Sequence, residues 1–197
     1  MASRADILSK IKANKPDSIA LPSLDLNVFD EGLNLVEEFT KKVEVVGGNV
    51  ITMISNEDVH KKVKRLFPDT KNNYSALKNA EDFNTLSLNN IKKPQDLEDL
   101  DVLVLESYLG VAENGAIWLE DSKIPMRVLP FITKHLVLVI DEKLLIPYMH
   151  QAYIKIEKFN GFGVFVSGPS KTADIEQSLV IGAHGALSLT VFLRKGD

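Results

Sequence analysis

The sequence predicts an α/β fold in which a mostly parallel sheet is covered by helices on both faces. Short apolar runs of strand length alternate with amphipathic segments of helix length along most of the chain. The strand-like runs are apolar at nearly every position, as is typical of parallel strands buried on both faces. One Asn-Gly pair between two apolar runs predicts an antiparallel hairpin. We therefore expect three layers, with the hairpin as an insertion or at an edge.

The first 27 residues predict a helix followed by an extended arm. Ser3 is a suitable N-cap for a helix that ends before Asn14, and Pro16 and Pro22 then favour an extended connection. The sequence shows neither an internal repeat nor a second linker. We therefore expect residues 1–197 to form one domain to which this arm is attached.

The remaining elements follow from hydrophobic periodicity and from the positions of glycine and proline. The expected helices cover residues 28–43, 59–66, 125–131, 144–158 and 170–181. The expected strands cover residues 49–54, 101–106, 135–140, 162–166 and 187–193, and the hairpin arms cover 109–112 and 116–119. Residues 74–88 show no clear pattern.

Charge and composition exclude several classes of partner. The 197 residues are 45% hydrophobic and 25% charged, and the formal net charge is only -4. This balance gives no drive toward phosphate backbones, so we expect no nucleic-acid partner. The apolar window 136–140 is far shorter than a membrane span, and residues 3–12 lack the apolar run of a secretory signal. We expect a cytoplasmic protein without a membrane partner.

The chain contains no cysteine. This excludes a disulfide, a thiolate zinc site, a cysteine nucleophile and any cofactor bound through cysteine, such as an iron–sulfur cluster. The histidine and acidic residues lack the spacing of a zinc site, so we expect no metal. In a redox pathway, electrons would be carried by another subunit. The sequence does not otherwise specify a cofactor.

The Gly-rich turn after the strand at 162–166 is the best candidate binding site. Here a buried strand is expected to run through a tight turn into a helix, leaving free backbone N–H groups for a ligand. The candidate ligand-binding residues are Gly168, Pro169, Ser170, Lys171, Thr172 and Asp174. Gly168 permits the turn, the hydroxyl groups cap the helix or donate to a ligand, and Lys171 offers a charge to a small anion. A purely structural turn with a good helix cap explains the same residues.

Two motifs closely resemble those of the LUD-domain family (lactate utilization protein C-like). The first is residues 167–176 with its continuation 179–185, and the second is the hairpin 110–119, followed by Leu129-Pro130 and His135. The resemblance covers roughly residues 30–195. The chain departs from the family at Asn114, where relatives usually have threonine.

The resemblance implies a fold like that of the sugar-phosphate isomerase, coenzyme A transferase and formyltetrahydrofolate cyclo-ligase group. It also implies an accessory or ligand-binding subunit beside iron–sulfur partner subunits in the oxidation of L-lactate to pyruvate. The alternative is a free-standing enzyme of the coenzyme A transferase or cyclo-ligase type that binds an anionic substrate. A regulatory domain that senses a small anion is a third interpretation.

Glu113 and His184 are the candidate catalytic residues. Glu113 matches the nucleophilic glutamate in the Ser-Glu-Asn-Gly stretch of coenzyme A transferases, although an acid beside an Asn-Gly hairpin is also commonplace. His184 lies between small residues and could contact an anion, or it could simply be hydrogen-bonded at the start of the last strand. Further candidate ligand contacts are Asn114, Gly115, Gly185 and Arg127, the last with Lys123 if their loop folds toward Lys171.

Overall fold

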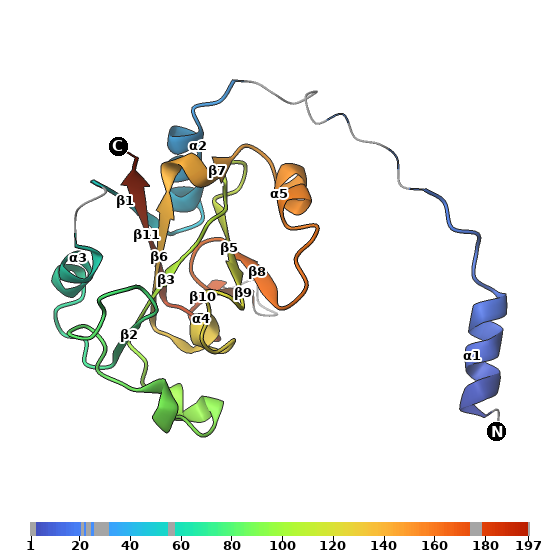
Figure 1. Ribbon diagram of the computed structural model, residues 1–197, viewed down its shortest axis with the longest axis horizontal. Coiled ribbons are helices and arrows are strands. Elements are labelled where there is room, and N and C mark those ends of the chain that lie inside the picture. Colours follow the sequence, from blue (N-terminus) through green and yellow to red (C-terminus); the bar gives the residue numbers. More distant parts are fainter. Residues whose placement is uncertain are drawn as a thin grey trace.

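Five parallel strands form the central sheet of the computed structural model, which describes residues 3–20, 22, 25, 32–54, 58–173 and 179–196 (Figure 1). Their spatial order is β1 (Asn49–Ile54), β11 (Ser188–Lys195), β6 (His135–Asp141), β3 (Val102–Glu106) and β2 (Asn73–Ser75). Every neighbouring pair runs parallel. The predicted mostly parallel α/β sheet is confirmed. β2 overlaps the start of residues 74–88, the segment that shows no clear pattern in the sequence.

Both faces of the central sheet are apolar, because alternate residues of each strand enter different cores. Val102, Val104 and Phe192 face a core shared with α3 (Val59–Leu66). Leu103, Leu105 and their equivalents on β6 and β11 face the other core, which includes α2 (Leu35–Val45). A strand buried in this way reads as a continuous apolar run rather than as an alternating pattern.

A second sheet of four strands packs over the α2 face of the central sheet. Its order is β7 (Leu145–Ile146), β4 (Gly110–Val111), β5 (Ala116–Glu120) and β8 (Gly163–Val166). β4 and β5 are the predicted hairpin, and β8 pairs antiparallel with β5. Ile117 and Leu119 point into the large core, whereas Trp118 packs toward α5 (Met149–Lys155). The hairpin is therefore part of a buried layer.

Several helices are shorter than the sequence predicts. The helix expected at 28–43 begins at Leu35, where the Asn34 side chain accepts a hydrogen bond from the backbone of Glu37; residues 28–31 lie outside the described residues. The helix expected at 144–158 is replaced by η3 (Glu142–Leu144), β7 and then α5. Leu145 and Ile146 pair with β4, so sheet hydrogen bonds take precedence over helical periodicity there. The remaining short helices are η1 (Leu88–Asn90), η2 (Pro94–Leu97) and α4 (Leu129–Ile132).

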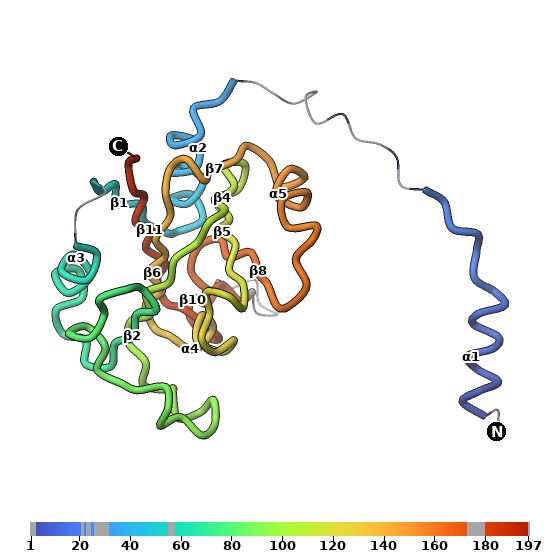
Figure 2. Tube along the Cα trace, in the orientation of Figure 1, coloured from blue at the N-terminus to red at the C-terminus, as the bar shows by residue number. Residues whose placement is uncertain are grey.

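The N-terminal helix α1 (Arg4–Ala13) forms where the sequence predicts it. Ser3 and Asp6 make a reciprocal capping box, and Asn14 is the C-cap. None of its residues is buried, and the tube in Figure 2 shows α1 well away from the body of the molecule. Within the described part of the chain, no helix is long and apolar enough to cross a membrane.

Candidate functional site

The turn at Gly168 is fixed by its packing against the end of α2. Gly168 has a φ of +72°, a left-handed conformation that favours glycine. A Cβ atom at this position would lie 2.7 Å from the backbone oxygen of Val46. The sequence therefore places glycine where the chain must both turn sharply and approach another backbone closely.

The helix predicted at 170–181 is wrong. β9 (Lys171–Ala173) pairs antiparallel with β10 (Leu179–Ile181), so a β-hairpin follows the turn. Ser170 explains the difference, because its backbone N–H donates to the carbonyl of Ala186 and its carbonyl accepts from the N–H of Gly182. These bonds bring the chain back on itself. No helix N-terminus is therefore available at this turn to bind an anion.

The turn follows the carboxyl end of β8, but it does not lie at the carboxyl edge of the central parallel sheet. β8 belongs to the second sheet and runs antiparallel to its neighbour β5. The turn after it meets the segments that precede β6 and β11, at the amino ends of the central strands. The rule that ligands bind at the carboxyl ends of parallel strands therefore does not apply to Gly168.

A cavity of about 230 Å³, here called the amino-edge cavity, lies where these segments meet. Its lining consists of Pro130, Phe131, Leu136, Val164, Phe165, Val166, Ser167, Gly168, Pro169, Ser170, His184, Gly185 and Ala186. Five residues predicted as site residues are among them: Gly168, Pro169, Ser170, His184 and Gly185. Ser170 Oγ donates to the carbonyl of His184 at 2.7 Å, which joins the two sides of the cavity.

The amino-edge cavity has an apolar wall and one ionisable side chain. Phe131 and Val164 belong to the wall, and among the described residues of the lining the exposed ring of His184 is the only titratable group. The Ser167 and Ser170 hydroxyls donate to backbone carbonyls, so their oxygens can still accept a hydrogen bond. This arrangement suits a small molecule with one apolar side and one polar or anionic group.

Lys171 and Thr172 lie at the start of β9, outside the lining of the amino-edge cavity. Both side chains are exposed. Lys171 extends toward the turn between α2 and β1, where a Cβ atom on Gly47 would be 3.7 Å from its Nζ. The candidate Asp174 lies outside the described residues.

The hairpin motif is held directly against the Gly168 turn. Ser167 Oγ donates to the backbone carbonyl of Asn114 at 2.8 Å. Gly115 has a φ of +67°, and a Cβ atom there would lie 2.8 Å from the backbone nitrogen of Val43. Asn114 itself does not have a positive φ, and its side chain accepts from the N–H of Ala116 at 3.0 Å. The connection is therefore not the two-residue type I′ turn that Asn-Gly favours.

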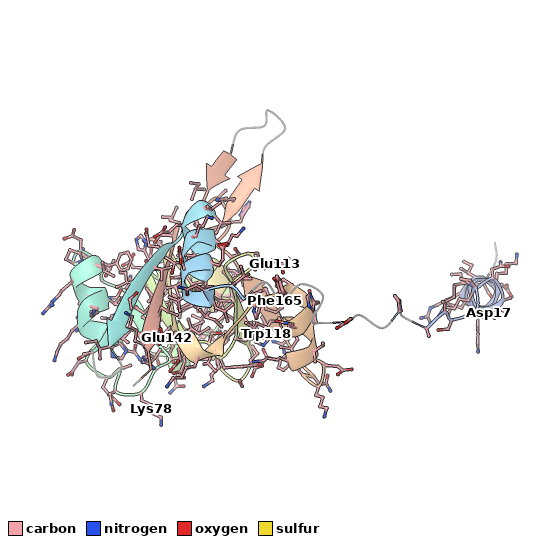
Figure 3. The ribbon with its side chains drawn as sticks, turned by 90° about the horizontal axis from the view of Figure 1, so that it is seen from above. Asp17, Lys78, Glu113, Trp118, Glu142 and Phe165 are labelled. Carbon is pink, nitrogen blue, oxygen red and sulfur yellow. The ribbon has the colours of Figure 1, made fainter. Side chains whose placement is uncertain are left out.

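Glu113 is exposed and its carboxylate has a structural partner. Glu113 Oε2 accepts a hydrogen bond from the backbone N–H of Met149, at the first residue of α5, at 2.8 Å. Its own N–H donates to the carbonyl of Pro147. Glu113 is not among the lining residues of the amino-edge cavity. Figure 3 shows it on the body beside the second sheet, to which the labelled Trp118 and Phe165 belong.

Arg127 and Lys123 do not close over the Gly168 turn. Arg127 makes two hydrogen bonds to Asp121, at 2.7 and 2.9 Å, and its guanidinium lies 5.3 Å from the ring centre of Phe162. Lys123 Nζ instead contacts Glu106 at 3.2 Å, at the carboxyl end of β3. The proposed closure toward Lys171 is therefore not formed.

Sequence reasoning missed a second cavity, of about 620 Å³, at the carboxyl ends of the central strands. This carboxyl-edge cavity is lined by Glu106 from β3, Arg194 from β11 and the loop after β2. The sequence feature that could have predicted this cavity is a charged residue at the end of an apolar strand, as in Val102–Glu106 and in Leu193-Arg194. No group of three or more His, Cys, Asp or Glu side chains suitable for a metal ion occurs among the described residues.

Comparisons with known proteins agree with these motifs. The family model described as LUD domain matches residues 36–193. Lactate utilization protein C of Oceanobacillus iheyensis is 34% identical over an alignment of 100 residues, and the match covers 47% of this chain and 43% of that protein. The same-named protein of Bacillus subtilis is 32% identical over an alignment of 111 residues, and the match covers 53% of this chain and 45% of that protein. The chain spans less than half the length of these two relatives.

A solved structure supports the fold. The crystal structure of a DUF162 family protein from Deinococcus radiodurans superimposes with a TM-score of 0.62 and covers 82% of this chain and 96% of that one. The two sequences are 13% identical. At this identity the likeness concerns the fold alone.

Proposed function

This chain belongs to the LUD-domain family, and from that premise we propose that it is an accessory or ligand-binding subunit in the oxidation of L-lactate to pyruvate. In this proposal the amino-edge cavity holds a small carboxylate. The observation that carries it is that the two ends of the first family-like motif, residues 167–170 and 184–185, meet around one small cavity. The similarity to proteins named lactate utilization protein C supplies the substrate class.

The chemistry of the amino-edge cavity supports a short hydroxy or keto acid as its ligand. His184 can donate a hydrogen bond to a carboxylate, and the bond is stronger when the ring is protonated. Ser170 Oγ can accept from a ligand hydroxyl, because its own hydrogen is directed to the His184 carbonyl. Phe131 and Val164 offer an apolar surface to a methyl group.

The proposed partners carry the electrons. Oxidation of lactate to pyruvate releases two electrons, and iron–sulfur clusters that accept electrons are held mainly by cysteine thiolates. This chain has no cysteine, so the proposal assigns such a cluster to another subunit.

Calorimetric titration with L-lactate and with pyruvate tests the proposed ligand. We expect saturable binding to the wild-type chain. The His184→Asn variant should bind about tenfold more weakly, because the shorter amide side chain carries no positive charge and does not reach the position of the imidazole N–H. Lys171→Ala is the matched control, since it removes a nearby exposed cation that does not line the cavity.

Two results would contradict the assignment of the carboxylate to the amino-edge cavity. One is wild-type affinity in His184→Asn. The other is a loss of affinity in Lys171→Ala alone, which would move the ligand to the start of β9 and restore the expectation from sequence.

A further inference from the structure

The carboxyl-edge cavity occupies the position at which parallel α/β sheets bind their ligands. It lies beyond the last residues of β2 and β3 and next to Arg194 near the end of β11. Its volume of about 620 Å³ falls in the usual range for small-molecule sites. Figure 3 shows the labelled Lys78 of this cavity on the opposite side of the body from the projecting β9 and β10. It is therefore separate from the amino-edge cavity.

Positive charge exceeds available negative charge in this cavity. Its cations are Lys78, Lys123 and Arg194, and its carboxylates are Glu106 and Asp121. Asp121 is already engaged by the Arg127 guanidinium and by the backbone N–H of Phe162 at 3.1 Å.

Among the residues that line this cavity, Glu106 is therefore the one carboxylate left to balance three cations. Asp58, which lines the adjoining cavity, is already paired with Lys61 at 3.5 Å. It contacts Lys123 Nζ at 3.2 Å and Arg194 Nη1 at 3.4 Å. Neither contact uses all the N–H donors of its cation, because an ammonium group has three and a guanidinium five. Lys78 is exposed and has no ion-pair partner in the part of the chain that the structure describes.

Arg194 provides an independent sign that a partner is missing. Its Nε atom is buried and has no hydrogen-bond acceptor among the described residues. A buried donor without an acceptor is costly and is rare in folded proteins. An acceptor placed in the cavity would satisfy this donor at the same time as it neutralised the guanidinium.

We propose that the carboxyl-edge cavity binds an organic phosphate monoester, anchored by Arg194 and Lys123 beside Glu106 and approached by Lys78. A phosphate group fits better than a single carboxylate, because it has three terminal oxygens and up to two negative charges for cations from three separate segments. Asn79 and Ser122 add polar groups for the body of the ligand. An adjoining cavity that includes His60 shares Lys78, Asn79 and Arg194, so the ligand has room to extend.

The test uses glycerol 3-phosphate and adenosine 5′-monophosphate as probes, with glycerol and adenosine as their uncharged counterparts. Binding is measured by calorimetry, and backbone amide shifts locate the site by NMR. We expect both phosphates to saturate the chain with dissociation constants below about 10 mM, and neither uncharged compound to bind. The amide signals of residues 76–79 and 106 should shift, whereas those of 168–170 and 184–186 should not.

Two substitutions in the cavity should weaken phosphate binding, and a third should strengthen it. Arg194→Lys and Lys123→Gln should each weaken phosphate binding about tenfold, because each removes charge-assisted hydrogen bonds. Glu106→Gln should strengthen it, because it removes the carboxylate that competes with the phosphate for both cations. Lys92→Gln, on the segment between η1 and η2, is the control for a general loss of positive charge. Circular dichroism checks that each variant is folded, and Lys78→Gln tests the site at an exposed position.

Several outcomes would overturn the proposal. They are no saturable phosphate binding by the wild-type chain, equal effects of Lys92→Gln and Lys123→Gln, or weaker phosphate binding in Glu106→Gln. His184→Asn should leave phosphate binding unchanged, so failure at one cavity can be distinguished from failure at the other.

Discussion

Ser167 and Asn114 are 53 positions apart in the chain, yet the Ser167 hydroxyl donates to the Asn114 carbonyl at 2.8 Å. This bond joins the two segments by which the sequence resembles the LUD-domain family. The glycines that adjoin them also lie against the same end of α2, Gly115 next to Val43 and Gly168 next to Val46. The two motifs therefore form one structural unit.

Removal of this hydroxyl should weaken the unit slightly. Ser167→Ala should lower the free energy of unfolding by about 0.5–1 kcal/mol, because the bond is partly open to water. Urea unfolding of Ser167→Ala and of Ser167→Thr, which keeps a hydroxyl, measures the difference. Equal losses in both variants would mean that the side-chain volume matters rather than the hydrogen bond.

The two glycines should tolerate no side chain. Gly115→Ala and Gly168→Ala should each destabilise the protein by more than about 2 kcal/mol, because a left-handed backbone and a backbone clash act together. Gly32→Ala is the matched control, since Gly32 has a φ of +63° but nothing within 4 Å of an added Cβ. It should cost only about 1 kcal/mol. A loss as large as that of the other two would show that conformation alone sets the effect.

Glu113 offers a test between a helix cap and a nucleophile. Glu113→Ala should lower the free energy of unfolding by about 1 kcal/mol, because it removes the acceptor for the first N–H of α5. Glu113→Gln, which keeps an acceptor oxygen, should lose less. Incubation with acetyl coenzyme A followed by mass spectrometry examines the alternative. A covalent adduct on Glu113 would establish the transferase interpretation.

Stability should decline in mild acid because of two half-buried histidines. Burial lowers the pKa of His60 and of His135 below the ordinary value of 6.5. The folded state then binds fewer protons than the unfolded state as the pH falls past 6.5. The contribution of the two histidines to the free energy of unfolding is fully present above pH 6.5. It is lost as the pH falls through their lowered pKa values.

Urea unfolding between pH 8 and pH 5 measures this decline. His60→Asn and His135→Asn should each flatten the dependence on pH, whatever they do to stability at neutral pH. His60 Nε2 lies 2.8 Å from Ser75 Oγ and His135 Nδ1 lies 2.8 Å from Ser188 Oγ, so both rings are held in fixed places. If the free energy of unfolding depended on pH equally in the wild type and in both variants, the decline could not be assigned to these two histidines.

A second acid-sensitive contribution comes from Asp101 at much lower pH. Burial raises the pKa of this carboxyl, but hydrogen bonds from the backbone of Asn72 and Lys71 and from the Lys134 ammonium outweigh it and lower the pKa to about 2. Asp101→Asn should therefore cost about 1–2 kcal/mol at neutral pH after allowance for solvent screening. The difference from wild type should shrink as the pH falls from about 4 toward 2. If the difference in free energy of unfolding between wild type and Asp101→Asn stayed constant across that range, the loss would come from packing rather than from the charge of Asp101.

The local sequence was sufficient to predict those elements whose residue pattern is compatible with only one type of secondary structure. Buried strands such as Val102–Glu106 and His135–Asp141 are apolar at almost every position, and Ser3 and Asn14 mark the ends of α1. The absence of cysteine and the two family-like motifs were also evident without coordinates. These features depend on composition and on neighbours within a few residues.

Only the tertiary structure decided how the turn after β8 continues and where charged side chains meet. Residues 170–181 have a plausible helix cap, but Ser170 hydrogen-bonds to Gly182 and Ala186, and a hairpin results. Glu106 and Arg194 are 88 positions apart and converge only because β3 and β11 end at the same edge of a parallel sheet. Lys123 reaches them from the segment that follows β5. Strand order is set by long-range packing, and periodicity along a single segment contains no information about it.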